Sequence, residues 1–263
     1  MNLKRALYPF ALLFGFISWL RNLCFDLGLF KSHPIPGKSI CIGNIAVGGT
    51  GKSPHIAYLI ELLQKQYAVQ VLSRGYGRKT NGLRIVETSS LPEEVGDEPL
   101  MLKKKFKEQT QIVVCENRRT GVQKLKEIQP DGLILLDDAF QHRKLVPDCA
   151  LLLTKFNDLY VDDFVFPVGG LRDLQFRARF ANAVGVTHVP LEQCTEETAH
   201  ILREKLRLKV SQKIILFHVN YETPRPIFGH FQWQNRAPSY MFAGLANNIA
   251  FFQKGMQLSR AVV

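Results

Sequence analysis

The sequence predicts an α/β protein in which a parallel β-sheet is covered by helices on both faces. Three observations lead to this prediction. Short apolar segments rich in β-branched residues recur along the chain, segments of helical periodicity lie between them, and a glycine-rich loop joins the first strand to the first helix. Strands buried on both faces of a parallel sheet read as continuous apolar runs. The 263 residues and 46% hydrophobic content suffice for such a core.

The first thirty residues are expected to form an apolar helix that associates with a membrane. Two basic residues precede an uncharged apolar run over 6–20, and Arg21 follows it. Fifteen residues are fewer than the roughly 20 that cross a bilayer, and no small-residue cleavage site follows as in a signal peptide. The flanking positive charges suit a cytoplasmic membrane surface. The alternative is a terminal helix packed on the domain.

A nucleotide-binding core is expected over residues 31–188. Ile56, Leu59, Ile60 and Leu63 follow the i, i+3, i+4, i+7 spacing of one apolar helix face, which predicts a helix over Pro54–Gln66. The strands are predicted near Ser39–Gly43, Val69–Ser73, Gln111–Cys115, Gly132–Asp137, Cys149–Thr154 and Ala183–Thr187.

Residues 189–263 are expected to form part of a second, smaller α/β lobe. Pro190 follows the last strand of the core, and a charged helical stretch over Glu196–Leu208 comes next. Strands are predicted at Lys213–Val219 and Ser239–Phe242, on either side of a proline-rich connection.

The glycine-rich loop carries the sharpest functional signal, because it follows a predicted strand and opens a predicted helix. Its glycines let backbone N–H groups turn towards phosphate oxygens, and the helix N-terminus adds a positive dipole end. Lys52 is suited to the β- and γ-phosphates and Ser53 to Mg²⁺, so the fold is predicted to be of the P-loop NTPase type. The nucleotide-binding residues are predicted to be Ala46, Val47, Gly48, Gly49, Thr50, Gly51, Lys52 and Ser53.

Two consecutive carboxylates, Asp137 and Asp138, end another apolar strand, and Gln141 and His142 follow. Ligands bind at the carboxyl edge of a parallel sheet, where the phosphate loop also lies. A carboxylate there can hold Mg²⁺ directly or through water. Helix capping would explain one of the two aspartates more easily than both.

Three further polar segments are less specific. Ser73–Arg78 combines two glycines with two arginines after a strand, as suits an anionic or sugar ligand, although a surface turn is an equal alternative. Gly96–Pro99 places two carboxylates before a helix, where capping is the competing explanation. Phe166–Asp173 is a Gly/Pro loop that ends in an Arg–Asp pair.

Taken in order, these motifs resemble the tetraacyldisaccharide 4′-kinase family over nearly the whole chain. The motifs are Gly43–Pro54, Arg74–Gly77, Gly96–Pro99, Asp137–Asp138 with Gln141–His142, Pro167–Asp173 and Phe242–Asn247. The resemblance implies that ATP phosphorylates the 4′-hydroxyl of a lipid A disaccharide 1-phosphate precursor, at the cytoplasmic face of the bacterial inner membrane. It implies ATP and Mg²⁺ as cofactors, and neither a nucleic acid nor a protein partner.

The resemblance also implies roles for individual residues. Asp97 is the base towards the 4′-hydroxyl, and Lys52 and Asp138 complete the catalytic set. The implied metal ligands are Ser53, Asp137, Asp138 and Asp173. The implied substrate-side residues are Arg74, Tyr76, Glu98, Arg118, Gln141, His142 and Arg172.

The chain departs from the family pattern in two places that matter. Asp173 stands where glutamate is usual, and the chain reaches Val263 without the later Asp-His-His segment whose histidine partners the catalytic carboxylate in the family. The expectation from sequence is therefore a member truncated at its C-terminus, with ATP and membrane binding retained and turnover impaired.

Net charge and cysteine content do not by themselves decide between this family and other classes of protein. A formal charge of +11 favours anionic partners without choosing among them, and the five cysteines lack a zinc-site spacing. A P-loop GTPase or metallochaperone is one alternative, but residues 155–158 hold the residues of a guanine-reading motif in the wrong order. A catalytically impaired nucleotide- and lipid-binding fragment is the other.

Overall fold

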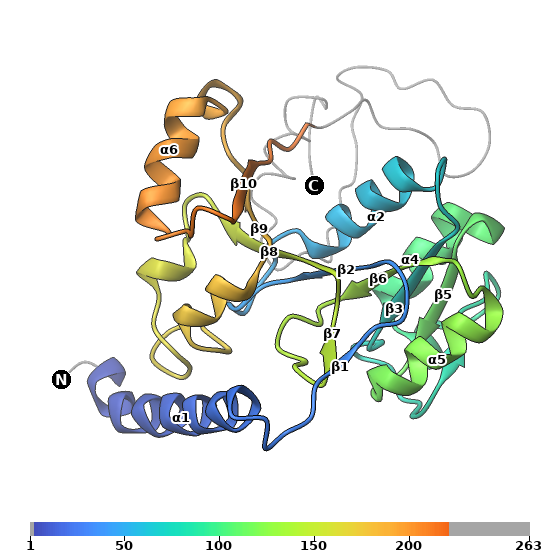
Figure 1. Ribbon diagram of the computed structural model, residues 1–263, viewed down its shortest axis with the longest axis horizontal. Helices are drawn as coiled ribbons and strands as arrows, with labels where there is room; N and C mark the ends of the chain where they lie inside the picture. Colours follow the sequence, from blue (N-terminus) through green and yellow to red (C-terminus); the bar gives the residue numbers. More distant parts are fainter. Residues whose placement is uncertain (1–2, 221–263) are drawn as a thin grey trace, which may run out of the picture. The chain divides into compact units, whose positions relative to one another are not determined.

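The computed structural model describes residues 3–220, and residues 3–217 belong to one compact unit. Apart from the terminal helix α1 (Leu3–Asp26), strands alternate with helices along this unit (Figure 1). The strands are β1 (His33–Pro34), β2 (Ser39–Gly43), β3 (Val69–Ser73), β4 (Arg84–Ile85), β5 (Gln111–Val114), β6 (Leu133–Asp137), β7 (Leu145–Val146), β8 (Cys149–Lys155), β9 (Ala183–Thr187) and β10 (Lys213–Leu216). The further α-helices are α2 (Lys52–Leu63), α3 (Pro92–Val95), α4 (Asp97–Phe106), α5 (Arg118–Ile128) and α6 (Glu196–Lys205). Short 3₁₀ turns are η1 (Lys107–Gln109), η2 (Tyr160–Asp162), η3 (Gln175–Phe180) and η4 (Leu191–Gln193).

Eight strands form one sheet in the order β10-β9-β8-β2-β6-β3-β5-β4. All neighbours are parallel except the edge strand β4, which runs antiparallel to β5. Strands β1 and β7 form a separate parallel pair. The order places β6 between β2 and β3, although the chain reaches β6 long after both. The carboxyl ends of these three strands therefore lie side by side.

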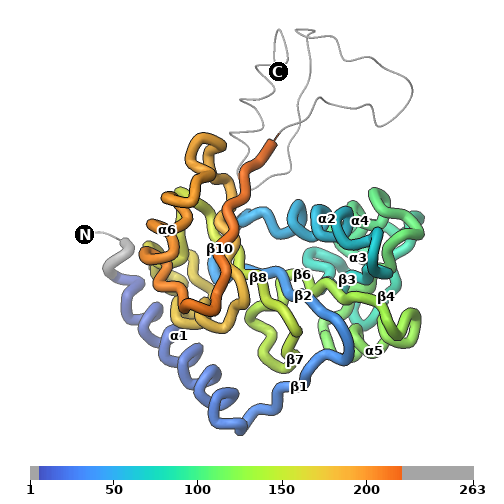
Figure 2. Tube along the Cα trace, turned by 45° about the horizontal axis from the view of Figure 1, so that its top comes forward, coloured from blue at the N-terminus to red at the C-terminus, as the bar shows by residue number. Residues whose placement is uncertain are grey.

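Two apolar cores flank the sheet, as expected for strands covered on both faces. Successive residues of β6 alternate between them: Leu133 and Leu135 join α2 and α4, whereas Ile134 and Leu136 join α5 and α6. Figure 2 shows α2 and α5 on opposite sides of the strands. The three-layer α/β/α arrangement predicted from sequence is thus confirmed, with helix boundaries shifted by two or three residues.

Helix α1 lies against the body of the unit along a narrow stripe of its surface. Ala11, Asn22 and Phe25 are its buried residues, and Gly15 lies beside Val165. Most of its large apolar side chains remain exposed. The stripe is narrower than the apolar face that a core helix buries.

The structure differs from the expected boundary at residue 189. Strand β10 pairs with β9 from Lys213 to Leu216, and Leu202 and Leu206 enter the main core. Residues 189–217 therefore extend the core sheet rather than begin a second lobe. The predicted strand Ser239–Phe242 and the rest of the expected lobe beyond residue 220 lie outside the described residues.

Candidate functional site

The phosphate loop has the predicted strand–loop–helix setting between β2 and α2. Gly48 and Gly51 adopt positive φ angles of 111° and 85°, which glycine reaches without steric cost. Inside the turn, the buried side chain of Asn44 donates to Thr50 Oγ1 at 2.9 Å. Lys52 begins α2, so its ammonium group and the free N–H groups of that helix share one end of the site. This arrangement suits a bound phosphate chain.

Asp138 is held by two cations beside this loop. Two guanidinium nitrogens of Arg172 donate to its carboxylate at 2.8 and 3.0 Å, and Lys52 Nζ lies 3.7 Å away. Burial alone would raise the pKa of Asp138, but the Arg172 hydrogen bonds and the Lys52 charge outweigh it and lower the pKa. Asp138 therefore stays anionic at neutral pH. Its positive φ of 45° is a costly backbone conformation for this residue, of the kind that clusters at functional sites.

Asp137 has the opposite electrostatic environment, although it is the adjacent residue. It is 5% exposed, accepts a 2.9 Å hydrogen bond from Ser73 through Oδ2, and has no hydrogen-bond partner at Oδ1. Burial, with the nearby Glu98 charge, raises its pKa to about 6. Neighbouring carboxylates with diverging pKa values are typical of catalytic sites. Because its second oxygen is free, Asp137 is suited to bind a metal or carry a proton.

This difference predicts opposite effects of two isosteric substitutions on stability. Asp137 binds its proton more tightly when folded, so its ionisation destabilises the fold as pH rises from about 4 to about 6. Asp137→Asn should raise the free energy of unfolding at pH 7.5 by up to about 3 kcal/mol, from a shift of roughly two pKa units, and have little effect at pH 4. Asp138→Asn should lower it at pH 7.5, because it removes an anion bound by Arg172. Urea titrations across this pH range test both, and a destabilised Asp137→Asn at pH 7.5 would contradict the assignment.

Basic side chains surround the approach to Asp137. Arg118 is 4% exposed and donates to the carbonyl oxygens of Cys115 at 2.7 Å and Asp137 at 3.3 Å. Burial and neighbouring cations lower the pKa of His142 to about 4, so this imidazole is neutral at pH 7. The cations are Arg118, Lys144, Arg21 and Arg74. Such a concentration of positive charge favours an anionic ligand.

The Arg74–Gly77 and Gly96–Pro99 motifs meet through their glycines. A Cβ atom on Gly75 would lie 2.8 Å from the carbonyl oxygen of Val95, and one on Gly96 would lie 3.0 Å from that of Tyr76. A larger residue at either position would meet these backbone oxygens and would also have to adopt the positive φ angles of 70° at Gly75 and 91° at Gly96. The contact places Asp97 and Glu98, both exposed, in the first turn of α4 at the carboxyl edge of the sheet. From this position the negative charge of Glu98 contributes to the raised pKa of Asp137.

The Phe166–Asp173 loop is attached directly to the phosphate loop. Val47 N donates to Gly170 O at 2.6 Å, and Arg172 N donates to Ile45 O at 2.7 Å. These backbone bonds fix the position from which the Arg172 side chain reaches Asp138. The loop therefore contributes to the site through a short, two-point connection to residues 45–47.

Asn44 is a site residue that the sequence analysis did not select. Its Oδ1 accepts hydrogen bonds from Arg172 and from Lys52 (3.4 Å), while its amide group donates to Thr50. Gln141 donates to its backbone oxygen. Asn44 is completely buried and joins three of the predicted motifs. A polar residue between an apolar strand and a phosphate loop was the available signal.

Asp173 is bound to helix α1 through one of its two carboxylate oxygens. Its Oδ1 accepts hydrogen bonds from Asn22 of α1 at 3.0 Å and from Leu174 N at 2.8 Å, and the residue is 1% exposed. The structure thus gives Asp173 a partner on α1, and its described hydrogen bonds do not include the phosphate loop. Its other oxygen, Oδ2, is buried without a hydrogen-bond partner among the described residues, so the metal role that the resemblance implied for Asp173 stays a prediction.

The remaining predicted donors fit Mg²⁺. Within residues 3–220 no group of three His, Cys, Asp or Glu side chains could form a protein-only metal centre. Mg²⁺ in nucleotide sites is bound by one or two carboxylates, with substrate phosphates and water as the other ligands. Asp138, the free Oδ1 of Asp137 and the hydroxyl of Ser53 at the start of α2 provide oxygens of this type.

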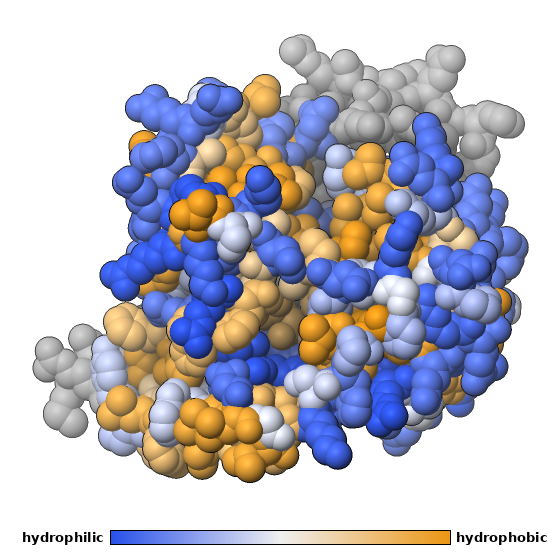
Figure 3. Space-filling model, in the orientation of Figure 1, coloured by the Kyte–Doolittle hydropathy of each residue, from blue (hydrophilic) through white to orange (hydrophobic). Residues whose placement is uncertain are grey.

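Helix α1 presents many large apolar side chains to the solvent. Figure 3 shows hydrophobic side chains gathered along it, at the lower left. By length and composition, Ala6–Asp26 could cross a membrane, and only 11% of this segment is buried. The exposed apolar residues of α1 are Tyr8, Phe10, Leu12, Leu13, Phe16, Ile17, Trp19 and Leu20.

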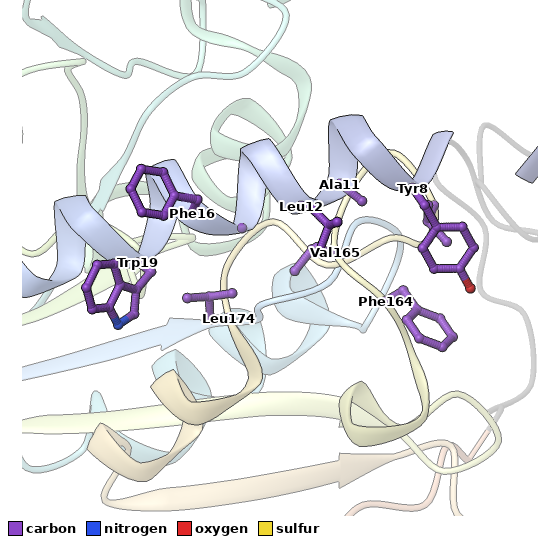
Figure 4. A pocket seen from close by; sticks show the side chains of 10 residues that line it. Tyr8, Ala11, Leu12, Phe16, Trp19, Phe164, Val165 and Leu174 are labelled. Carbon is purple, nitrogen blue, oxygen red and sulfur yellow. The ribbon is translucent and has the colours of Figure 1, made fainter. Parts of the chain in front are cut away.

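An apolar pocket of about 560 Å³ opens between α1 and the segment 164–174 (Figure 4). Phe164 packs edge-on against Tyr8, and Phe166 packs in the same way against Phe14. The pocket is lined by Tyr8, Ala11, Leu12, Gly15, Phe16, Trp19, Phe164, Val165, Val168 and Leu174. The loop that carries Arg172 into the site thus forms one wall of an apolar pocket.

Comparisons with known proteins agree with this geometry. A family model described as tetraacyldisaccharide-1-P 4′-kinase matches residues 3–262. A tetraacyldisaccharide 4′-kinase of Flavobacterium johnsoniae is 41% identical over 261 residues, covering 96% of this chain and 75% of the relative. That of Flavobacterium psychrophilum is 39% identical over 257 residues, covering 95% and 74%.

A solved structure shares the fold. The crystal structure of the "apo" form of LpxK from Aquifex aeolicus, in complex with ATP, aligns with a TM-score of 0.66 and 29% identity. The alignment covers 85% of this chain and 86% of that chain. These findings do not favour the GTPase, metallochaperone or impaired-fragment alternatives.

Proposed function

The chain belongs to the tetraacyldisaccharide-1-P 4′-kinase family and is an ATP-dependent kinase of lipid A biosynthesis, and we propose that the residues at the carboxyl edge of its sheet carry the phosphoryl transfer. The reaction moves the γ-phosphoryl group of ATP to the 4′-hydroxyl of a lipid A disaccharide 1-phosphate precursor. The observation that carries the proposal is the joint contact of Lys52, Asp138 and Arg172 beside the phosphate loop.

In the proposed mechanism, Lys52 and the N–H groups of the loop bind the β- and γ-phosphates. Asp138, Asp137 and Ser53 would hold Mg²⁺, which neutralises charge that develops on the phosphate oxygens. Arg172 orients Asp138 through two hydrogen bonds and keeps it anionic. With the phosphates bound in this way, transfer depends mainly on positioning and charge stabilisation.

The acceptor side of the site is proposed to lie at the edge formed by the Arg74–Gly77 loop and the first turn of α4. Asp97 is exposed there and can accept the proton of the 4′-hydroxyl as the γ-phosphoryl group leaves ATP. Arg74, Tyr76 and Arg118 border the same approach and are proposed to bind anionic and sugar groups of the lipid precursor. Glu98, Gln141 and His142 are proposed to shape this side of the site.

The reaction is tested with the purified chain, radiolabelled nucleotide and a tetraacylated disaccharide 1-phosphate in mixed micelles. Label should move from the γ-phosphate of ATP to the 4′ position of the lipid, with little transfer from GTP. Equal transfer from both nucleotides, or hydrolysis without lipid phosphorylation, would contradict the proposed assignment of the site.

We further propose that α1 seats the protein on an anionic membrane surface, at the cytoplasmic face of the bacterial inner membrane. The support is its exposed apolar face, the adjoining apolar pocket, and the lipid nature of the substrate. A helix of this kind lies in the interface and gains affinity from apolar burial and from anionic headgroups. The pocket beside it would then open towards the acyl chains.

The proposed membrane contact of α1 predicts that a triple variant of this helix binds vesicles more weakly. Phe10→Ser, Leu13→Ser and Ile17→Ser together remove three exposed apolar side chains, each worth about 1.5–3 kcal/mol on burial. Co-sedimentation with phosphatidylglycerol-containing vesicles should fall by at least about 100-fold in partition coefficient. The matched control carries Leu191→Ser, Ile201→Ser and Val210→Ser, which are at least as exposed but distant in sequence from α1. Equal binding of both variants would exclude α1 as the seat.

A further inference from the structure

Asn22 is a buried polar residue on helix α1, whose exposed surface is mostly apolar. It is 1% exposed on a helix whose large side chains are mostly apolar and exposed. A buried amide is costly unless it is hydrogen-bonded. Both polar atoms of the Asn22 side chain are hydrogen-bonded: Nδ2 donates to Asp173 Oδ1 at 3.0 Å, and Oδ1 accepts from Arg143 Nη1 at 3.3 Å.

The hydrogen bond between Asn22 and Asp173 connects α1 to the nucleotide site, because Asp173 is adjacent in sequence to Arg172. Asp173 follows Arg172, whose backbone is bound to Ile45 and whose guanidinium grips Asp138. The Asp173 carboxylate also accepts from Leu174 N, which fixes the turn after Arg172. Asn22 therefore anchors the carboxyl end of the short segment that presents Arg172.

The hydrogen bond between Asn22 and Arg143 connects α1 to the nucleotide site through the loop that carries Gln141. Arg143 also donates to the backbone oxygen of Asn22 at 2.6 Å and to Asp26 at 2.6 Å. Arg21 Nη2 donates to Gln141 O at 2.8 Å, and the Gln141 side chain donates to Asn44 O. The last turns of α1 thus hold both loops that end on Asn44, the residue that binds Lys52 and Arg172.

We propose that Asn22 is a positioning residue for phosphoryl transfer, which joins α1 to the Arg172 and Gln141 loops so that the helix and the nucleotide site move as one unit. The inference rests on the proposed function and adds a residue that touches neither ATP nor the acceptor. When Asn22 is lost, Asp173 and Arg143 keep their other partners but are no longer tied to each other. The segment that presents Arg172 is then held only by its backbone bonds to residues 45–47, so the Arg172–Asp138 pair is less firmly positioned relative to Lys52.

The primary test is Asn22→Leu, which keeps similar size and makes α1 more apolar. Its kcat should fall on the order of tenfold to a hundredfold, because small displacements far from the chemistry can cost this much. The KM for ATP should change less than about threefold, since the phosphate loop itself is intact. Vesicle binding should be unchanged or stronger. The control, Leu191→Ala, alters an exposed apolar residue of η4, outside α1 and both loops, and should keep its kcat.

A pair of substitutions at Asp173 keeps the proposal testable if Asn22→Leu folds poorly. Asp173→Asn retains an oxygen that can accept from Asn22 and should keep most of the kcat, whereas Asp173→Ala should lose as much as Asn22→Leu. Combined with Asn22→Leu, Asp173→Ala should cost little more than either alone, because residues that act together are not additive.

Three outcomes would overturn the proposal. The first is an unchanged kcat in folded Asn22→Leu. The second is a proportional loss of kcat, ATP binding and thermal stability in that variant, which would mark a purely structural role. The third is a Mg²⁺ requirement raised about tenfold or more in Asp173→Asn. The last would make Asp173 a metal ligand. Failure of the wild-type chain to phosphorylate the lipid disaccharide would instead count against the proposed function.

Discussion

Replacing Asp97 with asparagine is expected to lower kcat by about 10²–10⁴-fold, the usual contribution of a general base. ATP affinity should remain close to that of the wild type. The reason is the position of Asp97: it lies in the first turn of α4, exposed, on the side of the site formed by the Arg74–Gly77 loop. Lys52, Asp138 and Arg172, which hold the nucleotide side, are bound to one another and do not depend on it.

The measurement is steady-state kinetics with varied ATP and varied lipid, together with direct binding of a fluorescent ATP analogue. Glu93→Gln is the control, because it neutralises another exposed carboxylate four residues earlier, on α3. It should leave kcat within about twofold, as expected for a surface site. A large loss of ATP binding in Asp97→Asn would move Asp97 to the metal side of the site.

The second large effect is expected for Lys52→Ala, which should reduce turnover on the order of 10²–10³-fold or more. Lys52 begins α2 at the phosphate loop and is proposed to bind the β- and γ-phosphates, so its loss removes charge stabilisation from that position. The neighbouring cation, Arg172, is already bound to Asp138. The fold should survive, because Asp138 keeps both hydrogen bonds from Arg172, and Asn44 keeps those to Thr50 and from Arg172.

Circular dichroism and thermal melting of Lys52→Ala check the fold, and radiolabel transfer checks the activity. Lys105→Ala serves as a control, because Lys105 forms an exposed ion pair with Glu61 on the outside of α2 and α4. Exposed pairs of this type contribute little, so this variant should behave as the wild type. Near-normal turnover in Lys52→Ala would mean that residues 46–53 are not the phosphate-binding loop.

Part of the site could be predicted from sequence because its signals are local. A phosphate loop needs glycines at fixed spacing between a strand and a helix, and these glycines lie within about ten residues of one another. The apolar run that ends in Asp137 and Asp138 identifies both the strand and its carboxyl end. Resemblance to the family then joined motifs that no local rule connects, including Gly96–Pro99.

Other features depended on contacts between residues far apart in the chain. Asp137 and Asp138 are equivalent in sequence, yet burial beside Ser73 and Glu98 raises one pKa, while Arg172 and Lys52 lower the other. The strand order that puts β6 between β2 and β3 decides which loops meet. Asn44 becomes a common partner only when loops from residues 141 and 172 reach it.

The sequence by itself determined the α/β class, the phosphate loop, the acidic strand end and the apolar N-terminal helix of this protein. These depend on periodicity, glycine spacing and composition, which are properties of short segments. Only the tertiary structure decided that β10 extends the main sheet, that Asp173 binds Asn22, and that α1 is tied to the nucleotide site. The physical reason is that burial and hydrogen-bond partners are set by which strands and loops become neighbours, and partners 120–151 residues apart leave no periodic signal in the chain.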